Sequence, residues 1–236
     1  MPPTDPLVSH GSGARRHGRR TGILLVTLAL GAFVLGRAIR ATPGEPAFLG
    51  WTALLACVWA VGARWAGPLP AGRLGLAGVS WRRAGRSPSS VLLPPVGVAF
   101  VAVALPVASG LLLARIPPLR AWLEPLVDQA GTGSPSFRVA LVLVTLLAGI
   151  GEELFFRGAV YAAALDRHPV VVSTAVHALV TLIAGNPLLV VAALALGVLA
   201  GGQRRLSGGV GAPILVHLLW SVGMVVLLPP AVAAWG

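Results

Sequence analysis

The chain has 236 residues, of which 56% are hydrophobic and only 11% are charged, whereas a soluble domain carries about a quarter charged residues. This composition excludes a soluble domain and predicts an all-α bundle of transmembrane helices in contact with membrane lipids. All eighteen basic residues are arginines and the formal net charge is +11. Because the arginines lie between apolar runs, we expect them to face anionic lipid headgroups and not nucleic acid.

Apolar runs suited to crossing a bilayer recur along the chain. A spanning helix needs about 20 mostly apolar residues, and seven stretches meet or approach that length: 21–39, 47–65, 91–114, 137–155, 169–184, 187–202 and 212–228. We therefore predict about seven spans. An eighth would have to lie within 117–136, where Pro, Gly and charged residues instead predict a loop with an amphipathic piece around 122–127. Gly185-Asn186-Pro187 predicts a tight turn, and the GxxxG pair Gly197 and Gly201 favours close helix packing.

The arginines also predict the orientation, since basic residues favour cytoplasmic loops. A cytoplasmic N-terminus places thirteen of the eighteen on the cytoplasmic side, namely Arg15, Arg16, Arg19, Arg20, Arg64, Arg73, Arg82, Arg83, Arg86, Arg157, Arg167, Arg204 and Arg205. We predict a basic cytoplasmic tail over 1–20, N-terminal membrane helices over 21–136, a basic connector over 68–90 within them, and a core over 137–228. A bacterial plasma membrane is the expected location.

The two adjacent acids Glu152 and Glu153 are the main functional signal. An acid at the bilayer centre costs about 2.5–3.5 kcal/mol on insertion scales, so two together favour a functional site. Adjacent carboxylates on a helix point about 100° apart, so we expect them to serve different partners. Arg157 follows Glu153 by four residues and is expected to pair with it. Glu152, at the cytoplasmic end of its span, is then left for chemistry, although a helix-end ion pair at the membrane interface is the alternative.

His177 and His217 lie within the fifth and seventh predicted spans. A lone membrane histidine is more often a hydrogen bond between helices, but two of them with Glu152 on a third helix favour a shared site. One carboxylate and two imidazoles suit zinc with an open position for water. Without metal, the same groups activate water and stabilise an oxyanion. A proton relay or small transporter is a further alternative, although paired repeats with broken helices are missing.

The run Glu152-Glu153-Leu154-Phe155-Phe156-Arg157 resembles the EExxxR motif of the CPBP family of intramembrane proteases. That family, also called ABI, includes the CAAX prenyl endopeptidases and bacteriocin-immunity proteins. His177 matches the histidine of the family's FxxxH motif, and His217 begins its HxxxN or HxxxD motif. The resemblance covers roughly 137–228, which we therefore expect to be a CPBP-like catalytic core. Ser173 stands where the family has Phe, and Ser221 where it has Asn or Asp.

The resemblance implies an intramembrane (metallo)endopeptidase that hydrolyses a peptide bond of a membrane-associated peptide or protein. Glu152 would activate water or ligate zinc, and Glu153 and Arg157 would support and orient it. His177 and His217 would ligate the same zinc or stabilise the oxyanion. Ser221, one turn after His217, retains a hydroxyl but supplies no carbonyl or carboxylate. This departure favours, as the alternative, a catalytically impaired immunity or binding protein on the same scaffold.

Overall fold

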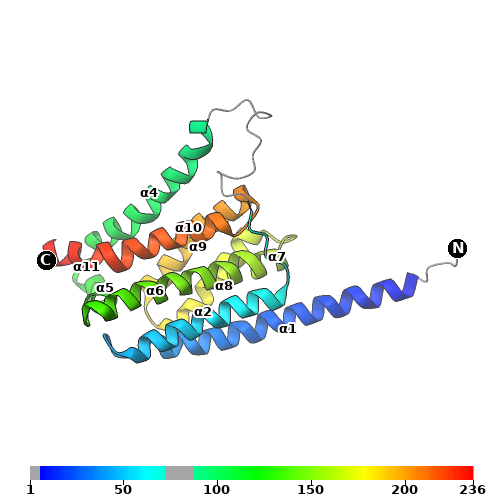
Figure 1. The fold of residues 1–236 in the computed structure, drawn as a ribbon, viewed down its shortest axis with the longest axis horizontal. Helices are drawn as coiled ribbons and strands as arrows, with labels where there is room; N and C mark the ends of the chain where they lie inside the picture. The colour runs from blue at the N-terminus through cyan, green and yellow to red at the C-terminus, as the bar shows by residue number, and fades with distance from the viewer. Residues whose placement is uncertain (1–5, 73–87, 236) are drawn as a thin grey trace.

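A computed structural model of the protein describes residues 6–72 and 88–235, and its described elements are all helical, which confirms the all-α prediction. In chain order they are α1 (Pro6–Ile39), α2 (Pro46–Ala66), α4 (Pro88–Leu113), α5 (Pro117–Gly131), α6 (Pro135–Glu152), the π-helical η1 (Glu153–Val160), α7 (Tyr161–Ala163), α8 (Pro169–Thr181), the 3-10 turn η2 (Leu182–Ala184), α9 (Pro187–Ser207), α10 (Gly211–Val222), the π-helical η3 (Gly223–Leu227) and α11 (Leu228–Trp235) (Figure 1). Most of the predicted basic connector, residues 73–87, and residues 1–5 of the predicted tail lie outside the described residues.

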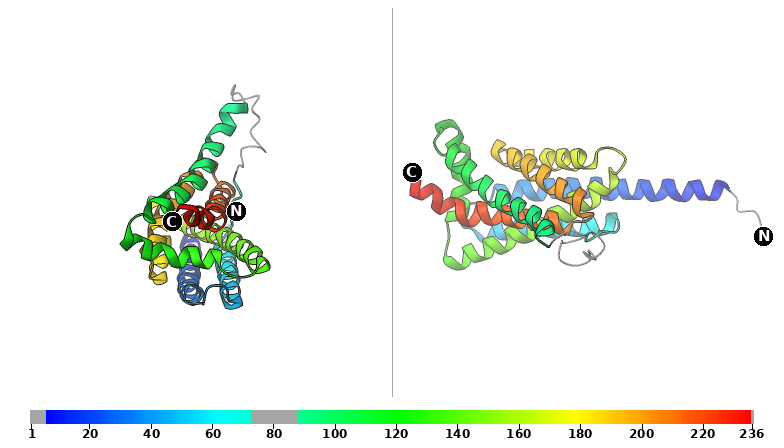
Figure 2. Two further views of the ribbon diagram at one scale, coloured as in Figure 1. Left: turned by 90° about the vertical axis from the view of Figure 1, so that its left-hand side faces the viewer. Right: turned by 90° about the horizontal axis from the view of Figure 1, so that it is seen from above.

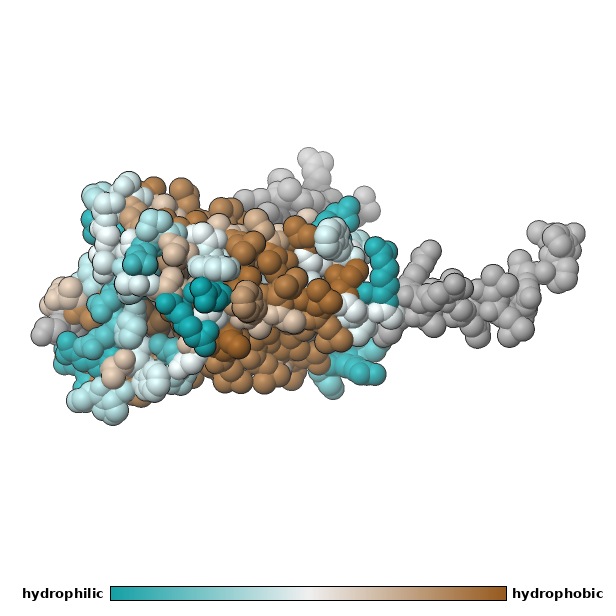
Figure 3. Space-filling model, turned by 90° about the horizontal axis from the view of Figure 1, so that it is seen from below, coloured by the Kyte–Doolittle hydropathy of each residue, from teal (hydrophilic) through white to brown (hydrophobic). Residues whose placement is uncertain are grey.

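Five helical stretches among the described residues are long and apolar enough to cross a membrane: Gly18–Ile39, Pro46–Ala66, Pro135–Ala163, Pro187–Ser207 and Gly211–Ala234. Two shorter apolar helices, Phe100–Leu113 and Pro169–Ala184, fall on the third and fifth predicted spans. Figure 3 shows a broad apolar belt between two more polar ends of the molecule. The protein is therefore an integral membrane protein, and a total of seven or eight spans stays a prediction.

The helix boundaries follow from local sequence signals. Proline fixes a helical φ and lacks the N–H that the first turn leaves unpaired. It is the first residue of α2, α5, α6, α8 and α9, at Pro46, Pro117, Pro135, Pro169 and Pro187. The predicted turn at Gly185-Asn186-Pro187 is present, with Gly185 at φ 68°. Asn186 caps α9, because its Oδ1 atom accepts a hydrogen bond from Leu188 N over 2.9 Å. These signals place the short connection between α8 and α9 at one end of the bundle.

The fourth predicted span is longer than its sequence pattern indicates. We expect it to end at Phe155, which would put Glu152 at its end, but helical structure continues through η1 and α7 to Ala163. A π-helix keeps the backbone groups paired within the segment, as a membrane requires. Gly158 does not break the helix, and an added Cβ there would meet Leu69 Cδ2 at 2.6 Å. Glu152 is consequently inside the continuous helical stretch Pro135–Ala163 and not at its end.

The helices pack in an order that surrounds α6 and η1. α1 lies along α2, α2 along α6 and η1, α8 along α9, and α10 against α4, α6 and α9. Figure 2 shows α1 extending beyond the bundle at its N-terminal end, while α4 diverges from the bundle toward its own start. The largest buried cluster lies where α1, α2 and η1 meet, and it includes Trp59, Phe155 and Phe156.

The close approach predicted for the GxxxG pair occurs where α9 meets α8. A Cβ atom added to Gly197 would lie 2.5 Å from Thr174 Cγ2 and 3.1 Å from Arg157 Nη2. Gly201 faces Val170 in the same way, since its added Cβ would lie 2.7 Å from Val170 Cγ1. Both glycines therefore let α9 press against α8.

We expect Gly197→Ala to destabilise the protein by about 1–3 kcal/mol, the usual cost of overpacking a filled interior. The matched control is Gly202→Ala in the same helix, because a Cβ there meets no atom within 4 Å. Alanine favours a helix more than glycine does, so Gly202→Ala should be neutral or stabilising. Thermal unfolding of the detergent-solubilised variants measures the difference, and equal midpoints would contradict the packing argument.

Candidate active site

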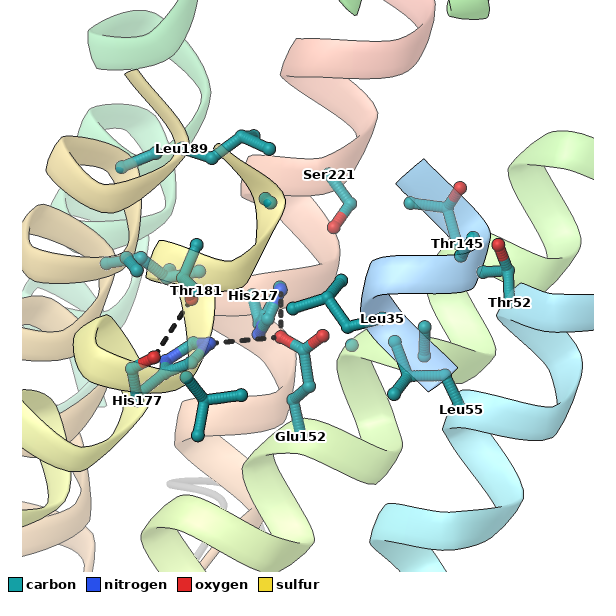
Figure 4. Close-up of a pocket in the computed structure, with 18 of the residues that line it drawn as sticks. Leu35, Thr52, Leu55, Thr145, Glu152, His177, Thr181, Leu189, His217 and Ser221 are labelled. Atoms are coloured by element: carbon teal, nitrogen blue, oxygen red, sulfur yellow. Dashed lines mark hydrogen bonds and ion pairs between the residues drawn. The ribbon is translucent and has the colours of Figure 1, made fainter. Parts of the chain in front are cut away.

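Three helices from distant parts of the sequence bring one carboxylate and two imidazoles together. Glu152 is the last residue of α6, His177 lies in α8 and His217 in α10. Glu152 Oε2 lies 3.4 Å from His177 Nε2 and 3.8 Å from His217 Nε2, and Figure 4 shows both rings beside this carboxylate. The structure thus places the three predicted side chains in one cluster, while their catalytic roles stay predictions.

Glu153 and Arg157 form a buried ion pair behind this cluster. Neither side chain is exposed, and Arg157 Nη1 donates to Glu153 Oε1 over 3.0 Å, which agrees with their spacing of four residues. The same Glu153 oxygen lies 2.9 Å from His217 Nδ1. The expectation that the two glutamates serve different partners is therefore wrong for His217. Its ring presents one nitrogen to each glutamate, so a single imidazole lies between two carboxylates.

In both histidines, the hydrogen-bond partner of Nδ1 indicates which ring nitrogen carries the proton. The Glu153 carboxylate accepts from His217 Nδ1–H, so the lone pair of neutral His217 is on Nε2 and faces Glu152. Arg157 Nη1 lies 3.1 Å from His177 Nδ1, and a guanidinium only donates, so neutral His177 carries its proton on Nε2. Glu152 is consequently faced by a hydrogen-bond donor on one side and an acceptor on the other.

Glu152 faces a cavity of about 270 Å³. Its side chain keeps 19% of its surface exposed, whereas that of Glu153 has none. The walls are mostly apolar, with four hydroxyl-bearing residues contributed by α2, α6, α8 and α10, which are Thr52, Thr145, Thr181 and Ser221 (Figure 4). Since a water molecule occupies about 30 Å³ in the liquid, the cavity has room for several waters or for a short piece of peptide.

The two serines that depart from the family motifs have different positions. Ser173 is fully buried and its Oγ donates to the carbonyl of Val170 over 3.3 Å, so it contributes to packing within α8. Ser221 lies one turn after His217 and lines the cavity, into which its hydroxyl points (Figure 4). Only the second departure changes the chemistry that a substrate would meet.

A buried aromatic cluster supports the site from the side of η1. Phe156 stacks on His177 with ring centroids 4.3 Å apart and an interplanar angle of 18°. Trp59 contacts both Phe155 and Phe156, at centroid distances of 4.9 Å and 5.2 Å. Stacking restricts the imidazole ring to one plane, which keeps His177 Nε2 directed at Glu152. The EExxxR motif leaves both phenylalanine positions unspecified, and no sequence signal indicates Trp59 on α2.

Arg204 in the last turn of α9 is a supporting residue that the sequence analysis does not single out. Its side chain is buried, its Nε donates to the carbonyl oxygen of Arg157 over 2.9 Å, and its guanidinium lies 4.9 Å from the Tyr161 ring centroid. Arg204 therefore holds the backbone of the residue whose side chain contacts both Glu153 and His177. The adjacent Arg205 is exposed, so the sequence offers no pattern that separates the two.

We expect Arg204→Ala to lower the free energy of unfolding by about 2 kcal/mol or more, because a hydrogen bond to a charged donor and a cation–π contact are both lost. Arg205→Ala is the control and should change the stability little. Unfolding of both variants in mixed detergent micelles gives the comparison. Equal losses for the two arginines would show that Arg204 does not support η1.

The arrangement does not suit a zinc ion held by Glu152, His177 and His217. A metal at His177 Nε2 would need the lone pair there, but the contact with Arg157 puts the proton on that nitrogen. Among the described residues, no group of three His, Cys, Asp or Glu side chains is placed to hold a metal ion. Zinc stays a prediction, and the reaction proposed below assigns no step to a metal.

The fold and the site together define an integral membrane protein whose spans enclose an acid–imidazole cluster. The family model described as Type II CAAX prenyl endopeptidase Rce1-like matches residues 134–223. This segment runs from the start of α6 to the end of α10 and contains all six residues predicted for the site. The predicted resemblance to the CPBP family is thereby confirmed, and at the level of the family the match supports an intramembrane protease. Comparisons with curated proteins and with solved structures gave no match.

Proposed function

We propose that the protein is an intramembrane endopeptidase that hydrolyses a peptide bond of a membrane-associated substrate with water activated by Glu152. The observation that carries the proposal is the position of the Glu152 carboxylate, which faces the cavity between the Nε2 atoms of His177 and His217. The second carboxylate, Glu153, is fully buried by its ion pair and its contact with His217. Glu152 is thus the carboxylate that a water molecule in the cavity can reach.

The proposed roles follow from the ring protons. Glu152 accepts a proton from water as the water oxygen attacks the scissile carbonyl, and it later returns that proton to the leaving amine. His177 Nε2–H faces Glu152 in the resting site, and it stabilises the negative charge that develops on the carbonyl oxygen as Glu152 takes up the proton from water. His217 presents a lone pair and orients the attacking water by accepting its other hydrogen. Glu153 and Arg157 hold the two rings in these tautomers.

The experiment is cleavage of membrane peptides by the purified protein in liposomes, followed by mass spectrometry in ¹⁸O-labelled water. We expect one new carboxylate oxygen per cleavage to come from the solvent. His177→Ala and His217→Ala should abolish cleavage, whereas His168→Ala should keep it, because His168 is exposed at the start of α8. Full cleavage by the His177 and His217 variants would eliminate the proposed mechanism.

The alternative is an immunity or binding protein that keeps the scaffold without catalysis. Ser221, at a position where the family motif has Asn or Asp, is the observation that favours it. This function would need the cavity but not a proton acceptor. It would be supported if Glu152→Ala and His177→Ala variants kept the full biological effect of the protein in cells.

A further inference from the structure

Most residues that line the cavity lie on one side of Glu152, while Trp59 and Phe156 form its inner wall. α1 and α8 contribute residues near their ends, and α2 and α9 contribute residues near their starts. Ile39 is the last residue of α1 and Ala184 the last of η2, while Phe48 and Leu189 are each third in their helices. These helix ends lie together at the end of the bundle away from the N-terminus of α1 (Figure 1). The cavity therefore runs from Glu152 to the face opposite the N-terminus.

The residues of α6 and α10 that line the cavity lie on this same side of Glu152. α6 runs toward the N-terminal face, and its cavity residues Thr145, Ala148 and Gly149 precede Glu152, while in the continuing η1 Phe156 follows it. α10 runs the other way, and Trp220 and Ser221 follow His217. In Figure 4 the labelled Leu189, Ser221, Thr145 and Thr52 accordingly all lie on one side of the Glu152 carboxylate.

Buried side chains and backbone contacts fill the other side. Phe155 and Phe156 follow Glu152 by three and four residues and pack with Trp59 in the largest buried cluster, so that Phe156 and Trp59 close the inner end of the cavity. Beyond them, the segment after α2 crosses the start of α10, where Val210 N donates to the Pro70 carbonyl over 3.0 Å. Arg20 Nη2 also donates to the carbonyl oxygen of Ala159 over 3.0 Å. The described residues on this side therefore separate Glu152 from the N-terminal face.

We propose that the cavity is a water-filled passage that reaches Glu152 from the membrane face opposite the N-terminus, so that this face supplies both the water and the substrate segment. This inference rests on the proposed function for its substrate, but not for the passage itself. The arginine distribution predicts a cytoplasmic N-terminus. The substrate is then a peptide segment that is exposed outside the cytoplasm or lies at the outer membrane surface.

Modification of introduced cysteines tests the passage without requiring catalysis. A thiol reacts as its thiolate, which forms in contact with water, so a charged impermeant methanethiosulfonate reagent reports water access from the side to which it is added. The background is Cys57→Ser, which removes the chain's single cysteine. Thr145→Cys places the probe in the cavity wall, and Leu147→Cys, on the same helix but 54% exposed on the outer surface of the bundle, is its lipid-facing control.

In sealed vesicles an impermeant reagent reaches only the face on the side to which it is added. We expect Thr145→Cys to react at least about tenfold faster when the reagent reaches the face opposite the N-terminus than when it reaches the N-terminal face, as in inverted vesicles. Leu147→Cys should react from neither side. A tag at the N-terminus, tested with protease in the same vesicles, identifies the two faces. Thr52→Cys and its exposed neighbour Leu54→Cys repeat the comparison on α2 in case a variant of α6 does not fold.

Faster reaction from the N-terminal face, equal reaction from both faces, or no reaction of either cavity cysteine would each overturn the proposal. A failure of the proposed function gives a different result. If the cysteines react as expected but the protein cleaves no peptide, the proposed hydrolase function is wrong and the proposed passage stands.

Discussion

Replacing Glu152 by Gln is expected to lower the rate of peptide hydrolysis by a factor of about 10²–10⁴, the usual contribution of a general base. Gln keeps the size of the side chain and its contacts with the cavity, but its amide accepts no proton from water. Because the side chain is partly exposed to the cavity and forms no buried ion pair with Arg157, the variant should fold as the wild type does. Initial cleavage rates in liposomes, at matched protein amounts, give the factor.

Glu124→Gln is the matched control for this experiment. Glu124 is an exposed acid on α5, paired with Arg120 over 2.8 Å and remote in sequence from the site. Its loss should leave the cleavage rate unchanged. If Glu152→Gln cleaved as fast as Glu124→Gln, another group would have to activate the water, and the proposed chemistry would have to be abandoned.

The largest effect on stability is expected from Arg157→Met, at about 3–5 kcal/mol. Met fills most of the volume of Arg but leaves the Glu153 carboxylate buried without its positive partner. The substitution also removes the partner of His177 Nδ1, which lies 3.1 Å from Arg157 Nη1 in the wild type. Reversible unfolding in mixed micelles, monitored by circular dichroism, gives the change in free energy.

The chain contains a second pair with the same spacing that serves as the control. Arg120 and Glu124 are also four residues apart, but about half of each side chain is exposed. Exposed pairs contribute little to stability, so Arg120→Met should have a small effect. The double variant Glu153→Gln, Arg157→Met should recover part of the loss, since no buried charge is left unpaired. A small effect of Arg157→Met alone would mean that the pair is not needed to hold the site.

The sequence predicts those parts of the fold and site that depend on local spacing or on the cost of charge in lipid. The spacing of Glu153 and Arg157 is one helical turn, and the structure contains their ion pair. The presence of Glu152, His177 and His217 within apolar runs predicts that they meet, because isolated polar groups are costly there. Proline and glycine mark the turns for the same local reason, as at Gly185.

Parts of the site that depend on tertiary contacts could not be predicted in this way. Nothing in the spacing indicates that His217 lies between Glu152 and Glu153, because that requires the position of α10 relative to α6. Arg204 and Arg205 are equivalent as sequence, and only the packing of α9 buries the first. The continuation of the fourth span past Phe155 depends on a change of helix type, which the hydrophobic pattern does not register.

The π-helical geometry of η1 has a consequence for the length of the motif that it contains. A π-helix closes its hydrogen bonds over five residues where an α-helix uses four, so Glu153–Val160 fits more residues into the same rise. Deleting one residue here would allow ordinary α-helical winding, which takes up the missing residue and leaves the downstream helix close to its present direction. Tyr161 would then stay near Arg204. Adding one residue has no such compensation, because it would turn everything downstream by about 100° relative to Glu152. The segment can therefore lose a residue more readily than it can gain one.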